Sequence, residues 1–166
     1  MPMPETAQPY YRQGTDVLNA ATNLGLLIKN VSASLHLAIN QRVAPLGLTA
    51  MQWRPLIMLR YHNARTPAEI ARLMNIDTGA MTRTLDRLEA KGFLLRQRCD
   101  EDRRLVLLEL TPEGHEVSGK ILPEIAQSMN EHLNGFSAAE IDILFSMLHR
   151  VIDNGRKATE GKTQAD

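Results

Sequence analysis

The middle of the chain carries two helix signals separated by a tight turn, and this order constrains the fold more than any other feature. Thr66 followed by Glu69 has the spacing of a capping box, which marks a helix start. Asn75 tolerates the left-handed conformation and ends this short helix. Asp77 then caps a second helix, which Gly92 terminates. The spacing predicts two consecutive helices joined by only a few residues.

Two strand signals follow directly. Phe93–Cys99 and Leu105–Leu110, joined by charged residues at 100–103, indicate a β-hairpin. A short helix, a turn, a second helix and a hairpin, in that order, form a winged helix-turn-helix lobe. The predicted fold is therefore mainly α, with a small β-hairpin as the wing.

The second of these helices has two different faces. Met81, Leu85 and Leu88 share one face at about 100° per residue and predict its core side. Most basic helix faces are merely solvated, but beside a hairpin with arginines at its tip such a face is typical of a helix that enters DNA. The opposite face carries small, polar and charged residues: Gly79, Thr82, Arg83, Asp86 and Arg87.

The residue types on that face suit DNA. Gly79 permits close approach to the DNA backbone, and Thr82 can bond a phosphate or touch a thymine methyl group. Arg83 can reach guanine O6 and N7, whereas Arg87, further round the helix, suits a phosphate. Asp86 is expected to pair on the surface with Arg83, Arg87 or Lys91 rather than to contact a base.

The predicted hairpin tip adds a second contact. Arg103 and Arg104 can place a guanidinium in the adjacent minor groove, where A·T-rich tracts hold a strong negative potential. Their neighbours Asp100 and Asp102 would orient the arginine or hold the loop.

Composition narrows the alternatives. A chain of 166 residues can bury one core, and 43% hydrophobic and 23% charged residues are ordinary for a globular protein. The net charge is zero, but Arg54–Arg104 holds 11 of the 19 Lys and Arg and only 7 of the 19 Asp and Glu, so the basic excess lies in the predicted lobe. The sequence has no apolar run long enough for a membrane span and no secretory pattern, so we expect a cytoplasmic protein without a membrane partner.

Further helices flank the lobe. From Val17 to Val43 apolar residues recur every three or four positions, over a surface too broad for one small core. We therefore expect part of this helix to pack against a second chain. Thr49 and Gln52 form another capping-box pair, and Pro55 inside the helix that follows predicts a bend.

Two more helices are predicted after the hairpin. One opens at Thr111, with a kink at Pro123, and the last is capped by Ser137 and Glu140. The predicted organisation is a flexible tail at 1–14, a dimerisation region at 15–48 and 112–155, a DNA-binding lobe at 49–111 and a second flexible tail at 156–166.

Three segments together resemble the MarR-type winged helix-turn-helix regulators of bacteria and archaea. They are LGLTAMQWRPL (46–56), TRTLDRLEAKGFLLRQ (82–97) and DEDRRLVLLELTPEGHE (100–116). The last fits the family's D-x-D-x-R wing and the L-T-x-x-G opening of the next helix. With the flanking helices, the resemblance covers residues 17–155.

The resemblance implies a homodimer, interlocked through the first, fifth and sixth helices, that binds pseudo-palindromic duplex DNA to repress or otherwise regulate transcription. The peroxide-sensing members carry a reactive cysteine near the start of the chain, and residues 1–50 have none here, so that mechanism does not transfer. The implied DNA contacts are Thr78, Gly79, Thr82, Arg83, Arg87, Arg103 and Arg104.

Regulators of this kind commonly bind small phenolic or aromatic carboxylate effectors beside the DNA-binding lobe. His36 and Asn40 lie one turn apart on the first helix and can meet Trp53 and Arg54 there. A cation for the carboxylate and an indole for the ring would suit such a ligand. The alternative is that Trp53 anchors the core and that His36 is a satisfied polar residue.

The remaining reactive residues suggest little chemistry. Cys99 is either an ordinary strand-end thiol or a switch activated by nearby arginines, in which case the protein is a thiol-responsive regulator. His115 and Glu116 lack a further ligand at metal-binding spacing. We predict no catalytic site, metal or cofactor. A winged protein-interaction module is one alternative function, and an enzyme that acts on an aromatic acid is another.

Overall fold

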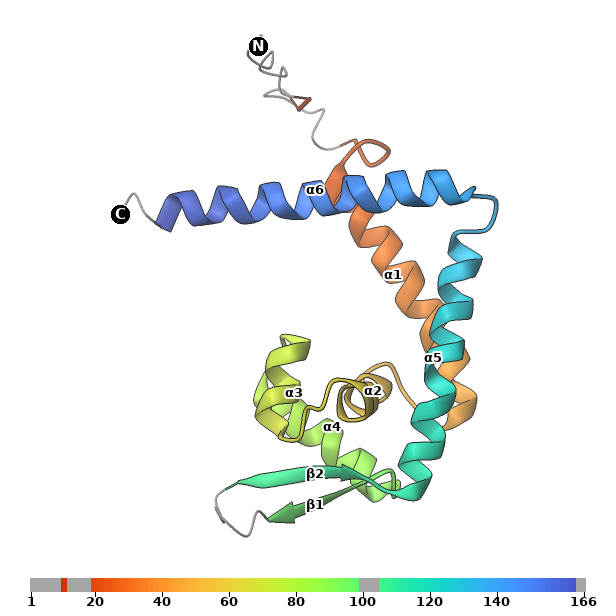
Figure 1. The fold of residues 1–166 in the computed structure, drawn as a ribbon, viewed down its shortest axis with the longest axis vertical. Coiled ribbons are helices and arrows are strands. Elements are labelled where there is room, and N and C mark those ends of the chain that lie inside the picture. Colours follow the sequence, from red (N-terminus) through yellow and green to blue (C-terminus); the bar gives the residue numbers. More distant parts are fainter. Residues whose placement is uncertain (1–9, 12–18, 99–104, 164–166) are drawn as a thin grey trace. The chain divides into compact units, whose positions relative to one another are not determined.

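The computed structural model describes residues 10–11, 19–98 and 105–163, with side chains as far as residue 160 (Figure 1). The chain divides into two compact units, residues 1–128 and 129–166, which are described separately. The described residues are mainly helical with one antiparallel hairpin, which confirms the predicted fold class. The elements are α1 (Leu24–Val43), the short 3-10 helix η2 (Ala44–Leu46), α2 (Trp53–Tyr61), α3 (Pro67–Met74), α4 (Thr78–Ala90), β1 (Leu94–Arg98), β2 (Val106–Leu110), α5 (Pro112–His132) and α6 (Ala138–Thr163).

Helix α1 begins later than its apolar period predicts. The Asn23 side chain accepts the backbone N–H of Leu26 at 2.8 Å and caps the helix. The Tyr11 hydroxyl accepts the N–H of Leu24 at 2.8 Å, and residues 20–22 form a turn. These local bonds satisfy the first free N–H groups, so the helix starts at Leu24 and not at Val17.

Helix α2 also begins later than predicted. Only half of the expected capping box forms: the Gln52 side chain accepts the N–H of Thr49 at 3.1 Å, while the helix itself starts at Trp53. Pro55 is therefore in the first turn, where a backbone N–H has no partner within the helix. Its position gives no cause for the predicted bend.

The caps predicted for α3 and α4 are confirmed. The Thr66 hydroxyl accepts the N–H of Glu69, and the Glu69 carboxylate accepts the N–H of Thr66, so the capping box is complete. Asn75 closes α3 with φ of 51° in the left-handed region. Asp77 caps α4 by accepting the N–H groups of Gly79 and Ala80 at 2.9 and 3.1 Å.

The hairpin is anchored at its base. Leu94 pairs with Leu110 and Arg98 with Val106, so both strands have one continuous register. The Thr111 hydroxyl donates to the Gly92 carbonyl at 2.6 Å, which ties the start of α5 to the chain that enters β1. The wing therefore continues directly into α5.

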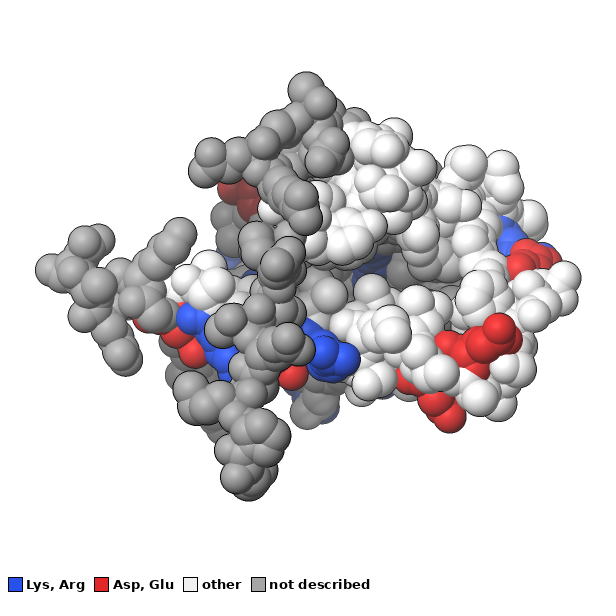
Figure 2. Space-filling view, turned by 90° about the horizontal axis from the view of Figure 1, so that it is seen from above, with Lys and Arg blue, Asp and Glu red and all other residues white. Residues whose placement is uncertain are grey.

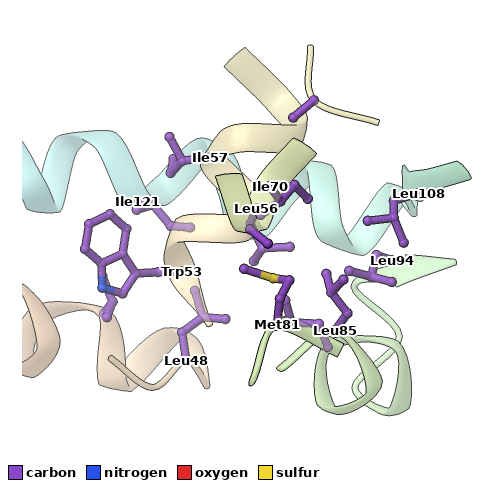
Figure 3. Close-up of a cluster of buried hydrophobic side chains, with 14 of the residues drawn as sticks. Leu48, Trp53, Leu56, Ile57, Ile70, Met81, Leu85, Leu94, Leu108 and Ile121 are labelled. Carbon is purple, nitrogen blue, oxygen red and sulfur yellow. The ribbon is translucent and has the colours of Figure 1, made fainter. Parts of the chain in front are cut away.

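One hydrophobic core joins α2, α3, α4 and the hairpin with the C-terminal end of α1 and with Ile121 of α5 (Figure 3). Met81, Leu85 and Leu88 are completely buried, which confirms the predicted core side of α4. Burial of a side chain of this size contributes about 1.5–3 kcal/mol. The buried side chains in Figure 3 include Leu48, Trp53, Leu56, Ile57, Ile70, Met81, Leu85, Leu94, Leu108 and Ile121.

Helix α5 is held close to the wing by a glycine. A Cβ atom on Gly114 would lie 1.8 Å from the carbonyl oxygen of Phe93. Because that atom belongs to the backbone, no side-chain rotation can relieve the contact. The helix continues through Pro123, where the predicted kink stays a prediction.

Helix α6 opens with the predicted cap. The Ser137 hydroxyl accepts the N–H of Glu140 at 3.3 Å, and the Glu140 carboxylate accepts the N–H of Ser137 at 2.8 Å. The helix runs to Thr163, so residues 156–163, which have no helical period in the sequence, continue α6. Strong helix formers such as Ala158 extend a helix one bond at a time without needing an apolar period.

Large apolar side chains are exposed on α1 and α6. On α6, Ile143, Phe145 and Met147 are each about half exposed, and no residue of this helix whose side chain is described is buried. Figure 2 shows wide areas without Lys, Arg, Asp or Glu on the face that it views. Among the described helices, none is long and apolar enough to cross a membrane.

Candidate nucleic-acid interface and the adjoining polar cluster

Helix α4 presents the predicted polar face to solvent. Thr78, Gly79, Thr82, Arg83 and Arg87 are all exposed. Gly79, Arg83 and Arg87 lie on the side of the helix away from its buried apolar residues, and Thr78 is the first residue of the helix, directly after the Asp77 cap. All five predicted α4 contacts are therefore accessible.

Two of these residues differ in what they can offer DNA. The Thr82 hydroxyl donates to the Thr78 carbonyl at 2.9 Å. A phosphate oxygen only accepts hydrogen bonds, so in this conformation Thr82 is better suited to touch a thymine methyl group than to bond a phosphate. A side chain on Gly79 would crowd the Asp77 carboxylate, which lies 3.0 Å from the Cβ position.

The charged residues around α4 are paired differently from the sequence-based expectation. Asp86 binds Arg96 of β1, with 2.7 Å between nitrogen and oxygen, and not Arg83, Arg87 or Lys91. The prediction failed because spacing along one helix does not show which strand packs beside it. Among the described residues, Arg83 and Arg87 form no ion pair, and both are exposed.

Arg96 and Lys91 were missed as structural cations. The Arg96 guanidinium also binds Glu89 at 2.6 Å. The Lys91 ammonium donates to the Gly47 carbonyl at 2.6 Å and to the buried Gln52 side chain at 2.7 Å. Basic residues near α4 thus divide into those that hold the lobe together and those that are left for a ligand. One signal in the sequence could have indicated the pairing with Arg96. Asp86 and Glu89 are three residues apart and therefore lie on the same side of the helix.

The predicted wing-tip contacts, Arg103 and Arg104, lie outside the described residues, as does Cys99.

The four predicted effector-binding residues do meet. The Trp53 indole N–H donates to Asn40 Oδ1 at 3.3 Å. The Arg54 guanidinium bonds His36 Nε2 at 2.5 Å and lies over the Trp53 ring, 5.1 Å from its centre. Because arginine can only donate, this His36 nitrogen is the acceptor.

Their exposure differs along the cluster. Trp53 is 8% exposed and belongs to the core, Asn40 and Arg54 are half-buried, and His36 is exposed. The indole therefore anchors the core, as the alternative interpretation of Trp53 predicted. Arg54 keeps further N–H donors beyond the one that faces His36.

The remaining candidates show no arrangement for catalysis. Glu116 pairs with Lys120 at 2.6 Å, and the hydrogen bond and charge of Lys120 lower the pKa of Glu116 below its usual value. The His115 carbonyl accepts from Arg60 and from Ser118. The described part of the chain contains no group of three His, Cys, Asp or Glu residues able to hold a metal ion.

Comparison with known proteins identifies the family. The model of the MarR family matches residues 48–106, which span α2 to the start of β2. The multiple antibiotic resistance protein MarR of Salmonella typhimurium is 32% identical over 139 residues, covering 83% of this chain and 96% of that protein. The chain belongs to the MarR family. Membership places it among transcriptional regulators and not among enzymes.

Solved MarR-family structures have the same fold. A mutant of E. coli MarR complexed with operator DNA has a TM-score of 0.70 and 32% identity, covering 82% of this chain and 98% of that one. The transcriptional repressor CouR bound to a 23-mer DNA duplex has a TM-score of 0.71 and 26% identity, covering 86% and 99%.

Proposed function

We propose that this MarR-family regulator is a homodimer that binds pseudo-palindromic operator DNA and represses a nearby operon until a small phenolic or aromatic carboxylate ligand releases it. The observation that carries the proposal is the exposed face of α4, on which Arg83 and Arg87 form no ion pair with the described residues, opposite a completely buried core side. A capped helix with such a face is suited to the major groove. Two relatives solved as complexes with DNA support the same role.

The proposed contacts divide by chemistry. Arg83 reads guanine, Thr82 and Gly79 approach the bases and the backbone, and Thr78 and Arg87 bind phosphates. Arg103 and Arg104 enter the minor groove from the wing. The net charge of the whole chain is zero, but these positions bring several basic residues together. A local basic surface of this kind can bind DNA phosphates.

The exposed apolar side chains support a dimer. Val31 and Leu37 on α1 and Met147 on α6 are each more than half exposed in the single chain. Exposed apolar surface on long helices is typical of regions that pack against a second chain. The proposed dimerisation region comprises residues 15–48 and 112–155, and the lobe at 49–111 binds DNA.

The proposed ligand site is the cluster of His36, Asn40, Trp53 and Arg54. Arg54 would bind the carboxylate and the Trp53 indole would face the ring. A ligand releases DNA only if it binds the DNA-incompetent arrangement more tightly than the competent one. The cluster joins α1 to α2, so it is placed to favour one arrangement of these helices over another.

Selection from a random duplex library at one near-physiological salt concentration tests DNA recognition. We expect a pseudo-palindrome whose half-sites lie about 34 Å apart, one turn of B-DNA. A pool that stays random would contradict the proposal and favour a winged module that docks a protein.

Arg83→Ala then tests the assigned reader. We expect specific binding to weaken by about 1–3 kcal/mol, with relaxed discrimination at one base position. Lys29→Ala is the control, because it removes one exposed charge from α1. Equal affinities for the Arg83 and Lys29 variants would show that the contact is assigned wrongly.

Trp53 is the only tryptophan and reports the ligand site directly. Titration with hydroxybenzoates should change its fluorescence, and Arg54→Gln should weaken the apparent affinity about tenfold, the loss of one charge-assisted bond. An unchanged titration in the Arg54 variant would remove Arg54 from the site. No fluorescence change in the wild type would argue against an aromatic acid as the effector.

A further inference from the structure

The strand β1 and the helix α4 are joined by one forked side chain. Two nitrogen atoms of the Arg96 guanidinium bind separate carboxylates, Asp86 at 2.7 Å and Glu89 at 2.6 Å. Residues three positions apart lie on the same side of a helix, so the planar fork spans both. Arg96 is 26% exposed, and Asp86 is 54% exposed.

We propose that Arg96 is a positioning residue, which fixes the first strand of the wing against the DNA-reading helix and thereby sets how well the protein distinguishes its operator from other DNA. This inference rests on the proposed function, since it needs a protein that binds DNA through α4.

The base of the strand is held by other contacts. Phe93 accepts the N–H of Thr111 at 3.2 Å, and Leu94 is buried in the core. Arg96 lies two residues further toward the wing tip, where the burial of the strand decreases. Leu108, which pairs with Arg96 across the hairpin, is buried and donates its N–H to the Arg65 carbonyl at 2.7 Å, so β2 is held at this level by the core. The two ion pairs of Arg96 are the polar link from β1 itself to α4.

The position of Asp86 gives the link a second effect. Asp86 is exposed on the polar side of α4, near the turns that carry Arg83 and Arg87. A free carboxylate there would repel DNA phosphates, and pairing with Arg96 offsets its charge. The fork is only partly buried, so its contribution to folding is modest, and its loss should alter DNA discrimination more than stability.

The test compares specific and non-specific affinity in variants that keep the fold. Arg96→Lys preserves the charge but cannot bind two carboxylates in one plane. We expect the ratio of non-specific to specific Kd to fall about tenfold, which corresponds to about 1.4 kcal/mol. Interaction energies between residues in contact are commonly of this size. The matched control is Arg98→Lys, on the same face of β1 two residues on and exposed.

The double variant Asp86→Asn with Glu89→Gln removes the other side of the fork. It should lower the same ratio by a similar factor, and adding Arg96→Lys to it should cause no further loss. Because the ratio compares two DNA molecules on one protein, a general change in stability or charge largely cancels. Thermal midpoints within a few degrees of the wild type would confirm that each variant folds.

Three results would overturn the inference. One is an unchanged ratio in Arg96→Lys, and another is an equal loss when Arg96→Lys is added to the double variant. The third is a salt slope lowered by about 0.9 in Arg96→Gln and restored in Arg96→Lys, which would make Arg96 a phosphate contact. Wild-type protein that recovers no specific site would instead overturn the proposed function on which the inference depends.

Discussion

The winged lobe and helix α6 use their apolar residues in opposite ways. In the lobe, Leu56, Met81 and Leu85 are completely buried among neighbours from the same chain. On α6, Phe145 and Ile152 are about half exposed, although the helix is longer than any in the lobe. The difference indicates that the lobe satisfies its own core, whereas α6 carries apolar surface that a second chain can bury.

Helix α1 shows both behaviours within one element. Near its C-terminal end Ile39 and Val43 are buried in the lobe core, while Leu27, Val31 and Leu37 are exposed. A single helix thus contributes one end to the self-contained core and leaves the rest available to a partner. The lobe should therefore respond most strongly to substitutions in its own packing.

Gly114→Ala should cause the largest effect, because it forces α5 away from the base of the wing. The added Cβ would lie 1.8 Å from the Phe93 carbonyl oxygen, which is backbone and cannot rotate away. We expect a loss of about 3 kcal/mol or more in the free energy of unfolding, measured by urea denaturation at one fixed protein concentration.

Gly119→Ala on the same helix is the control. Its Cβ would meet only the guanidinium end of Arg60, at 3.3 Å, and that side chain can move. Alanine also favours a helix over glycine by roughly 0.5–1 kcal/mol, so this variant should be as stable as the wild type or slightly more so. Equal losses in the two variants would mean that the wing contact is not the cause.

Phe145→Asp tests the other half of the comparison. A carboxylate placed in the proposed apolar dimer contact should weaken association by about 1–3 kcal/mol, roughly 10- to 100-fold in the dimer Kd. Sedimentation measures the change, as a shift toward the chain mass of 18.6 kDa. Trp53 fluorescence should stay unchanged in the monomer, because Trp53 is buried among the side chains of the lobe core.

Ser146→Asp places the same charge at the next position and should leave the dimer Kd within about threefold of the wild type, as surface substitutions usually do. A dimer unaffected by Phe145→Asp would show that this face of α6 is not the interface. Loss of the Trp53 signal on dissociation would show that the lobe is less independent than its burial indicates.

Local signals in the sequence predicted the local structure well. The caps at Thr66, Asp77 and Ser137 form as expected, since each depends on residues within one turn. The starts of α1 and α2 were predicted too early because an apolar period does not show where competing hydrogen bonds begin. Tertiary partners were the least predictable part of the fold.

The candidate sites show the same division. The exposed face of α4 follows from helical spacing alone, and the meeting of Asn40 with Trp53 was correctly anticipated. The partners of Asp86 and Lys91 were not, because Arg96 lies on the following strand and Gly47 lies in a turn before α2, and helical spacing shows neither. Charge counts alone therefore overstate how many cations near α4 are free to meet DNA.

The smallest expected effect comes from the two capping boxes, one in each unit. Backbone hydrogen bonds from Arg65 and then Thr66 lower the pKa of Glu69 below its usual 4.5. Bonds from the backbone and side chain of Ser137 likewise lower the pKa of Glu140. Each carboxylate therefore stabilises its folded helix start above pH 4.5, and this contribution is lost as the pH falls through the lowered pKa.

Only the α3 box should affect unfolding of the lobe. Thr66→Ala should lower the free energy of unfolding by about 1 kcal/mol, as loss of an N-cap usually does.

Glu69→Gln should lower lobe stability at pH 6, and the difference in stability between this variant and the wild type should shrink below pH 4.5. Urea titrations followed by Trp53 fluorescence measure both effects, with Glu140→Gln as the matched control. The described side chains of the lobe core come from elements other than α6, so Glu140→Gln should not move this transition at either pH. A shift as large as that of Glu69→Gln would show that the two units unfold together and that the lobe does not satisfy its core alone.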